Sequence, residues 1–518
     1  MALIRAFATV GGYTAISRVL GFARDVLIAG TLGAGPLADA FFVAFKFPNL
    51  FRRLFAEGAF NAAFVPLFAG RLEAEGQEPA RRFAQEALSF LLFWLLLLTA
   101  AAMAAMPWLM PVIAPGFVGN AEQFDLAVEL TRICFPYLLF MGLVALFSGL
   151  LNSMQRFAAA AAAPIVLNLC FVLALLFVVP HAERPAHALS WAVAVAGMLQ
   201  FALLLLAVRR AGMSLRLPVP RLTPGVRRLL KLMGPGLLSS GAMQINLLIG
   251  TMIATLQVGA VSWLYYADRV YQLPLGLIGI AIGVVLLPDL ARKLRGGAPE
   301  AALHSLNRAL ELALFLTLPA AVALAVIPGP IITVLFERGA FDLADAENTA
   351  LALTAFALGL PAFVLVKILQ PAFFAREDTV TPLRFALVSV AVNIVLSLAL
   401  FFLIGFLGIA LATTISSWVN SGLLAWRLRR DGHLALDEGA RRRLPRALLA
   451  SAVMGLAVWG ASIALEPWLT GPEVVRFPAL AALVAAGLAI YALLALATRA
   501  VELAELRGLL RRRGARPR

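Results

Sequence analysis

The chain has 518 residues, of which 62% are hydrophobic and 14% charged, and its mean hydropathy is +0.91. About half of the residues of a soluble protein are apolar, so this composition excludes a soluble multidomain protein and predicts an all-α polytopic membrane protein. The net charge of +15 does not indicate a nucleic-acid partner, because the Lys and Arg residues follow a loop pattern instead of forming one basic face.

Apolar segments long enough to cross about 30 Å of hydrocarbon recur along the whole chain, and we predict 14 transmembrane helices. The first half contains six, at 6–30, 37–68, 84–113, 126–151, 160–180 and 187–208. The second half contains six more, at 230–255, 260–290, 305–336, 346–372, 382–404 and 407–428, and two follow at 446–466 and 475–500. The N-terminus lacks a signal-peptide pattern, so we expect the chain to start with its own first span.

Charged and polar side chains share one helical face in each of the first two spans. In SRVLGFARD (17–25) they are Ser17, Arg18, Gly21, Arg24 and Asp25. In the second span Asp39, Lys46 and Arg53 recur every seven residues, with Asn49 and Arg52 beside them. A charge near the bilayer centre costs about 3 kcal/mol, so several together are tolerable only around water or a bound anion. We therefore interpret this stretch as the wall of a ligand cavity.

An internal repeat relates the two halves at an offset near 221 residues. FVPLFAGRL (64–72) matches LLPDLARKL (286–294), AAAMAAMP (100–107) matches AVALAVIP (321–328), and LLLLAVRRAG (203–212) matches LLAWRLRRDG (423–432). Because each repeat has an even number of spans, both enter from the same side, which predicts a pseudo-two-fold axis along the membrane normal. The predicted domains are an N-terminal six-helix lobe (1–215), a C-terminal six-helix lobe (223–435), two additional transmembrane helices (445–505) and a basic cytoplasmic tail (506–518).

The loop charges orient the chain. With the N-terminus inside, the predicted external loops contain few of the 43 Lys and Arg residues, namely Arg184, Arg338 and Arg476. Cytoplasmic loops of membrane proteins are enriched in these residues, so we expect both termini in the cytoplasm. Cys134 and Cys170 lie in apolar runs without a CxxC motif or a nearby histidine, which indicates buried thiols; we expect no metal site and no cofactor.

The eighth predicted span carries its own polar face, formed by Ser262, Tyr265, Tyr266, Arg269 and Gln272. Across both halves the intramembrane cations outnumber the acidic residues by about two charges, which a pyrophosphate would balance. Arginine suits that ligand because its planar fork binds phosphate oxygens through paired hydrogen bonds. Three alternatives stay open: arginines that extend to the membrane interface, structural ion pairs with the adjacent acids, as for Arg24 with Asp25 or Arg269 with Asp268, and a packing role for the tyrosines.

Four motifs resemble the MurJ (MviN) family of lipid II flippases: SRVLGFARD, ADAFFVAFKFPNLFRRLFAEGAF (38–60), APGF (114–117) and SWLYYADR (262–269). The resemblance implies a multidrug/oligosaccharidyl-lipid/polysaccharide exporter fold with a V-shaped cavity between two lobes, and a groove for the undecaprenyl tail on the two C-terminal helices. It also implies a transporter, not an enzyme. The cargo would be lipid II, the undecaprenyl-pyrophosphate-linked peptidoglycan precursor, moved from the cytoplasmic to the periplasmic leaflet of the bacterial inner membrane by alternating access.

The family's substrate-binding positions fall here on Ser17, Arg18, Arg24, Asp39, Asn49, Arg52, Arg53, Ser262 and Arg269. Possible supporting residues are Asp25, Lys46, Tyr266 and Gln272. Implied partners are lipid II, membrane lipids and cell-wall synthesis proteins. Sodium coupling is not expected, because the seventh and eleventh spans offer Gln244, Asn246 and Asn393 but no acidic residue; the membrane potential or protons remain as energy sources.

Three other functions would each show some of these sequence features. A flippase for another polyprenyl-linked saccharide would share the pyrophosphate argument. A multidrug exporter of the same fold would favour buried carboxylates over arginines, because its cargo is cationic. A membrane glycosyltransferase would need acidic pairs or metal ligands on a substantial external loop, whereas the predicted external loops are short.

Overall fold

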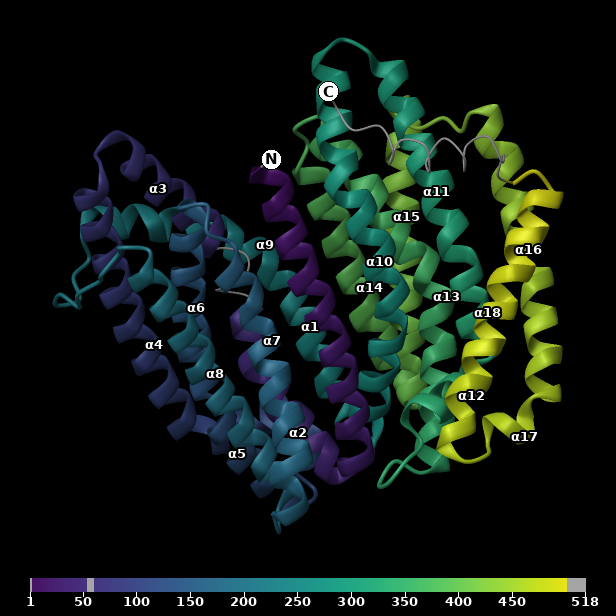
Figure 1. Cartoon of the computed structure of the whole chain (residues 1–518), viewed down its shortest axis with the longest axis horizontal. Helices are drawn as coiled ribbons and strands as arrows, with labels where there is room; N and C mark the ends of the chain where they lie inside the picture. Colours follow the sequence, from purple (N-terminus) through teal and green to yellow (C-terminus); the bar gives the residue numbers. More distant parts are fainter. Residues whose placement is uncertain (1, 54–59, 501–518) are drawn as a thin grey trace. The chain divides into compact units, whose positions relative to one another are not determined.

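The structure is a computed structural model that describes residues 2–53 and 60–500 (Figure 1). Side chains are described for these residues except at 2–8, 235–240, 242–243, 277 and 279–284. Apart from an isolated bridge between Arg338 and Phe341, the regular structure of the described part is helical. The predicted all-α class is confirmed.

The contacts divide the chain into two compact units. The first comprises Met1–Ser262 with Arg338–Phe341, and the second Trp263–Glu337 with Asp342–Arg518. This division differs from the predicted lobe boundary at 215–223, because the helix that follows this boundary packs with the first unit. The predicted domain bounds remain a prediction about the transport lobes.

In the first unit, α1 lies alongside α7, α6 alongside α8, and α2 against α5 (Figure 1). Its elements are α1 (Ala2–Leu32), α2 (Pro36–Arg52), α3 (Asn61–Ala74), α4 (Gln77–Ile113), η2 (Pro115–Phe117), α5 (Ala121–Cys134), α6 (Pro136–Ser153), α7 (Ala158–Leu173), η3 (Ala174–Val178), η4 (Val179–His181), α8 (Pro185–Arg210) and α9 (Pro224–Ala254).

In the second unit, α15 packs against α13 and α14, and α11 against α13 and α16. Its elements are α10 (Ala260–Arg295, which begins in the first unit), α11 (Pro299–Val326), α12 (Pro328–Phe336), α13 (Leu343–Phe374), α14 (Val380–Ile404), α15 (Phe406–Arg430), α16 (Glu438–Ala464), α17 (Glu466–Leu469) and α18 (Glu473–Ala497). Leu310, Ile368 and Leu424 belong to a core that joins α11, α13 and α15.

Ten helical segments of the described residues are long and apolar enough to cross a membrane, which makes this a multi-pass membrane protein. They are α4, α5 with α6, α7 with its η3 and η4 extension, α8, α11, α13, α14, α15, α16 and α18. The other four predicted spans coincide with α1, α2 with α3, α9 and α10. That these also cross the membrane remains a prediction.

Two predicted spans are interrupted by proline. The span expected at 126–151 breaks at Phe135, before Pro136, and the span expected at 305–336 breaks at Ile327, before Pro328. Proline has no backbone N–H to continue the helical hydrogen bonds, so each helix ends there and a new one starts. Apolar length alone did not reveal these breaks.

The two halves that match in sequence also have turns of the same backbone conformation at corresponding positions. Gln155 and Glu377, 222 positions apart, both adopt a left-handed conformation, with φ of 59° and 64°. At both turns the following amide donates to the carbonyl five positions before it, at 2.8 and 3.1 Å. Gly212 and Gly432, 220 positions apart, have φ of 82° and 72°. The repeated sequence therefore folds into repeated turns.

The turn Arg338–Phe341, which connects α12 to α13, belongs to the first unit and packs on the end of α1. The Ala340 amide donates to the Gly30 carbonyl at 2.8 Å. Gly33 has a φ of 66°, and a Cβ added there would lie 2.3 Å from the Ala340 carbonyl oxygen. Only glycine permits both this conformation and this close approach.

The two C-terminal helices, α16 and α18, are tied to the second unit. A Cβ at Gly455 of α16 would lie 2.5 Å from Val322 of α11, so these helices meet closely at the glycine. The Tyr491 hydroxyl of α18 donates to the Phe315 carbonyl of α11 at 2.7 Å. Pro319 lacks the N–H that would normally bond this carbonyl, so Tyr491 supplies the missing donor.

This arrangement predicts that Tyr491→Phe lowers thermal stability more when Pro319 is present than when it is replaced. Interhelical hydrogen bonds in membranes contribute on average about 0.6 kcal/mol, so we expect a small drop in the melting temperature of the purified protein. In a Pro319→Ala background, the Phe315 carbonyl regains an intrahelical partner, and the same change should have less effect. Equal losses in both backgrounds would contradict the assignment.

Candidate functional site

Arg24 of α1 is a buried cation held by two side chains. Its Nη2 and Nε donate to Asp25 Oδ1 at 2.7 and 3.0 Å, and its Nη1 donates to Asn168 Oδ1 of α7 at 2.9 Å. The residue is 7% exposed. A buried arginine is stable only when its charge and its donors are matched. The Arg24–Asp25 ion pair, one of the interpretations that the sequence left open, is present in this conformation.

Asn168 joins two positions of the predicted polar stripe. Its Nδ2 donates to the Ser17 carbonyl at 2.8 Å and to Ser17 Oγ at 3.2 Å, while its Oδ1 accepts from Arg24. A Cβ at Gly21 would lie 3.4 Å from Asn168 Nδ2, so this glycine leaves room for the amide to lie across α1. Arg18, in contrast, is exposed.

An aromatic ring covers the guanidinium of Arg24. Its Cζ lies 5.3 Å from the ring centroid of Phe171 on α7, within the range of a cation–π interaction. The Phe171 ring stands edge-on to Phe41 and Phe45 of α2, with centroids 6.3 and 5.5 Å away. Because apolar rings exclude water, the polar contacts of Arg24 are stronger than they would be at a surface.

Asp39, in the first turn of α2, binds the start of α10. Its Oδ2 accepts from the Gly259 amide at 2.6 Å, and its Oδ1 accepts from the Ser262 amide and hydroxyl at 2.9 and 2.6 Å. Asp39 and Ser262 are both 0% exposed. The first amides of a helix lack intrahelical partners and attract an anion, so this carboxylate is well matched. The two predicted cavity residues therefore bind each other in this conformation.

The second half of α2 and the residue after it carry three more of the predicted site cations, Lys46, Arg52 and Arg53. Arg52 Nε donates to Asn49 Oδ1 at 3.0 Å, and Asn49 Nδ2 donates to the Phe45 carbonyl at 2.9 Å. Arg53 is exposed. The predicted site residues Asn49 and Arg52 are thus in direct contact.

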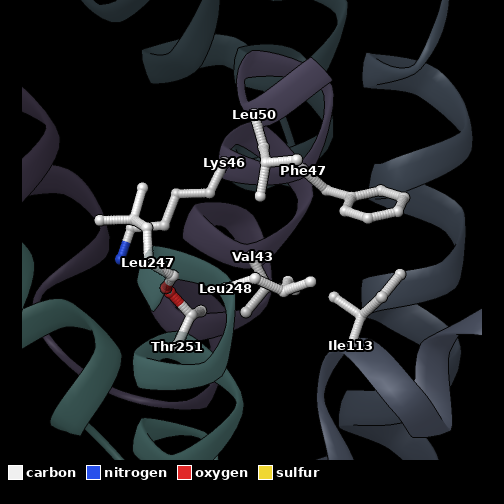
Figure 2. Close-up of a pocket in the computed structure, with 8 residues that line it drawn as sticks. All are labelled: Val43, Lys46, Phe47, Leu50, Ile113, Leu247, Leu248 and Thr251. Carbon is white, nitrogen blue, oxygen red and sulfur yellow. The ribbon is translucent and has the colours of Figure 1, made fainter. Parts of the chain in front are cut away.

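Lys46 borders a small recess between α2, α4 and α9 (Figure 2). A cavity of about 20 Å³ is lined by Val43, Lys46, Phe47, Leu50, Ile113, Leu247, Leu248 and Thr251. Figure 2 shows the Lys46 amine beside Leu247. Such a volume is close to that of one water and far below that of a ligand pocket, so in this conformation the recess does not hold a glycolipid.

The polar face of α10 continues in the second unit. The Arg269 Cζ lies 4.6 Å from the ring centroid of Tyr265, and Gln272 Nε2 donates to the Asp268 carboxylate. Tyr266 is fully buried, with ring centroids 5.7 Å from Tyr265 and 5.3 Å from Phe336. Its contacts here are those of a packing residue, the alternative that the sequence left open for the tyrosines.

A family model described as "Lipid II flippase MurJ" matches residues 28–478. A "Probable lipid II flippase MurJ" from Rhizobium tropici is 49% identical over 526 residues, covering 100% of this chain and 98% of the relative. The chain belongs to the MurJ family. The "Lipid II flippase MurJ" from Burkholderia cenocepacia is 38% identical over 466 residues, covering 89% of this chain and 90% of the relative.

Solved structures agree with this assignment in fold. A structure described as "Lipid II flippase MurJ, inward closed conformation" matches with a TM-score of 0.78 at 24% identity, covering 94% of this chain and 97% of the other. An inward-facing multidrug resistance MATE family transporter of the MOP superfamily matches with a TM-score of 0.67 at 17% identity, covering 80% and 95%. The chain therefore has a fold like that of MurJ and MATE transporters, whereas the two lobes with a V-shaped cavity between them stay a prediction.

Sequence reasoning missed three residues that complete the buried contacts of this MurJ-family chain. Asn168 lies in the apolar run LNLCFV, where a lone amide was the only signal, and Gly259 lies in a loop before α10. Arg132 of α5 donates through Nε to the Met103 carbonyl at 2.8 Å. Pro107 leaves this carbonyl without its helical partner, so Arg132 has a structural contact away from the predicted site.

We expect Asn168→Leu to impair function, because it removes an acceptor from Arg24 and both donors to Ser17 while keeping a similar volume. A hydrogen bond to a charged group contributes about 1.5–3 kcal/mol, so transport should fall roughly tenfold or more. The measurement is complementation of a strain depleted of its own MurJ-family protein, with membrane levels determined by blotting.

Asn348→Leu is the matched control for this change. Asn348 is half-buried on α13, and its amide donates to the Ala344 carbonyl of its own helix. The control should complement normally. Normal growth with Asn168→Leu as well would show that α7 merely packs against α1 at this position.

Proposed function

We propose that this chain is a lipid II flippase, which translocates the undecaprenyl-pyrophosphate-linked peptidoglycan precursor from the cytoplasmic to the periplasmic leaflet by alternating access. The observation that carries the proposal is the similarity to MurJ relatives over the full length of the chain. The buried cation Arg24, placed beside an amide and a carboxylate, supplies the chemistry that a pyrophosphate requires.

Arg24 would bind the pyrophosphate by exchanging partners. Its guanidinium now donates to Asp25 and Asn168, and a phosphate oxygen can replace the Asp25 carboxylate without changing the type of contact. Asp25 therefore balances the charge of Arg24 in the absence of cargo. Arg18, Arg52, Arg53 and Arg269 would contribute further positive charge, with Lys46 in support, as predicted from the sequence.

The contact of Asp39 with the first turn of α10 would depend on the transport state. Three hydrogen bonds to one carboxylate favour the conformations in which they form. A ligand can shift the equilibrium between these conformations and those without the bonds only if its contacts differ between the two. We call this contact between Asp39 and the start of α10 the switch. Asp39 and Ser262 would form it in addition to their predicted place in the cavity.

The architecture proposed for this function has fourteen transmembrane helices. Two six-helix lobes would be related by a pseudo-two-fold axis along the membrane normal, which the turns at Gln155 and Glu377 support. Both termini would lie in the cytoplasm, and the membrane would be the bacterial inner membrane. We also keep the prediction that the membrane potential or protons, and not sodium, drive transport, and that cell-wall synthesis proteins are partners.

The two C-terminal helices would accommodate the undecaprenyl tail. Leu488 and Leu493 of α18 are more than half exposed, and the helix is otherwise fixed to α11 through Tyr491. An apolar surface on a helix that is itself held in place is suited to contact with a polyprenyl chain. The alternative is that these helices only pack against the second unit.

We expect Arg24→Ala and Arg269→Ala to abolish growth of a strain depleted of its own flippase, while the proteins remain at normal levels in the membrane. Arg24→Lys and Arg269→Lys should also be impaired, because lysine keeps the charge but loses the paired hydrogen bonds. The biochemical readout is lipid II translocation in liposomes, with and without an imposed membrane potential.

Arg81→Ala is the control, because Arg81 lies near the start of α4 and pairs there with Glu78. Exposed ion pairs of this kind contribute little, so this variant should grow and transport normally. Growth supported by both Arg24→Ala and Arg269→Ala at normal membrane levels would refute the role of arginine in binding the pyrophosphate.

A further inference from the structure

The residue after Ser262 has its own carboxylate partner. The Trp263 Nε1–H donates to Asp345 Oδ1 of α13 at 3.0 Å. The indole also lies against Phe406 at the start of α15, with ring centroids 4.9 Å apart. Neither the binding of cargo nor the contact of Asp39 explains why this indole should be held by a buried acid.

Asp345 is a fixed partner and not a loose side chain. It lies in the first turn of α13 and is buried, and its own amide donates to the Asp342 side chain at 2.9 Å. Asp342 is the N-cap of this helix, so the cap and the helix start hold the backbone of Asp345 in place. A hydrogen bond to Asp345 therefore fixes Trp263 relative to α13.

The contact of Asp39 with the start of α10 depends on how the backbone there is oriented. Asp39 accepts three bonds there, and all of them require the Gly259 and Ser262 donors to face α2 together. Gly259 has a φ of 83°, and glycine is the residue with the greatest backbone freedom. A small rotation about this glycine would turn the Ser262 amide and hydroxyl away from the carboxylate.

We propose that Trp263 and Asp345 are positioning residues for the switch formed by Asp39. One residue along a helix corresponds to a rotation of about 100°, so the indole leaves α10 in a different direction from the Ser262 side chain. Asp39 binds the Gly259 and Ser262 donors, and Asp345 binds the indole of the next residue along the chain. This inference rests on the proposed function only in taking the Asp39 contact to change during transport.

The experiment measures exposure at Asp39 directly, without transport. Ala38, next to Asp39, is 0% exposed, so Ala38→Cys reports when this region opens. The full-length protein, with Cys134 and Cys170 replaced by alanine, is purified in nanodiscs and labelled with a water-soluble maleimide. Asp39→Asn serves as the positive control, since it removes the charge that binds the start of α10.

Trp263→Phe keeps the ring against Phe406 but removes the N–H donor. We expect about a fivefold faster labelling of the thiol introduced by Ala38→Cys, the change in an opening equilibrium that the loss of one hydrogen bond produces. Asp345→Ala should have the same effect, whereas Asp345→Asn, which retains an acceptor oxygen, should label close to the wild-type rate. In the Asp39→Asn background, Trp263→Phe should add little.

Trp418→Phe is the matched control. The Trp418 indole on α15 likewise donates at 3.0 Å, to the Leu358 carbonyl, and its loss should leave labelling unchanged. The proposal would be overturned if Trp263→Phe left the labelling rate unchanged. It would also be overturned if Trp263→Phe raised that rate by the same factor with and without Asp39→Asn. Because no lipid II is present, this outcome is separate from a failure of the proposed flippase activity, which is measured by translocation.

Discussion

The structure depends on one constraint: a charge inside a membrane protein has to be matched by a partner. Arg24 is matched by Asp25 and Asn168, and Asp39 by the first turn of α10. In the second unit, Glu311 of α11 accepts from Arg308 and Arg443 at 2.7 and 3.3 Å. Each pairing connects different parts of the chain or neighbouring turns of a helix, so charge balance and tertiary structure are fixed together.

Under the proposed function, this constraint would allow the proposed anion site to exist before its ligand arrives. An arginine without a counter-ion would be too unfavourable to bury, and an arginine with a permanent partner could not bind cargo. Asp25 resolves the conflict because it neutralises Arg24 through the same kind of contact that a phosphate makes. Asn168, which is neutral, can keep its contact while the anionic partner changes. Under the proposed function, the ligand would select among conformations by competing with internal partners.

Much of this arrangement follows from sequence periodicity. The spacing of Ser17, Gly21 and Arg24 predicted one helical face, and that face contacts α7. The repeat predicted from short motifs recurs in the conformations of Gln155 and Glu377. Periodicity determines which side chains share a face, because it is a property of the local backbone.

The partners of these faces could not be predicted in the same way. Asn168 lies 144 residues from Arg24, and no local pattern pairs them. Likewise, the sequence did not predict that Asp39 binds amides at the start of α10, because unpaired helix amides leave no mark in a sequence. The grouping of α9 with the first unit also depends on long-range packing, which composition does not specify.

The central claim, that Asp25 holds Arg24 in place of a pyrophosphate, is tested most directly by ligand affinity. Undecaprenyl pyrophosphate is titrated against the purified protein and its Asp25→Asn variant by native mass spectrometry, with undecaprenyl monophosphate for comparison. Removal of a competing carboxylate should tighten binding of the pyrophosphate severalfold, and Arg24→Gln should abolish that gain. Binding to Asp25→Asn that is equal to or weaker than binding to the unaltered protein would contradict the account.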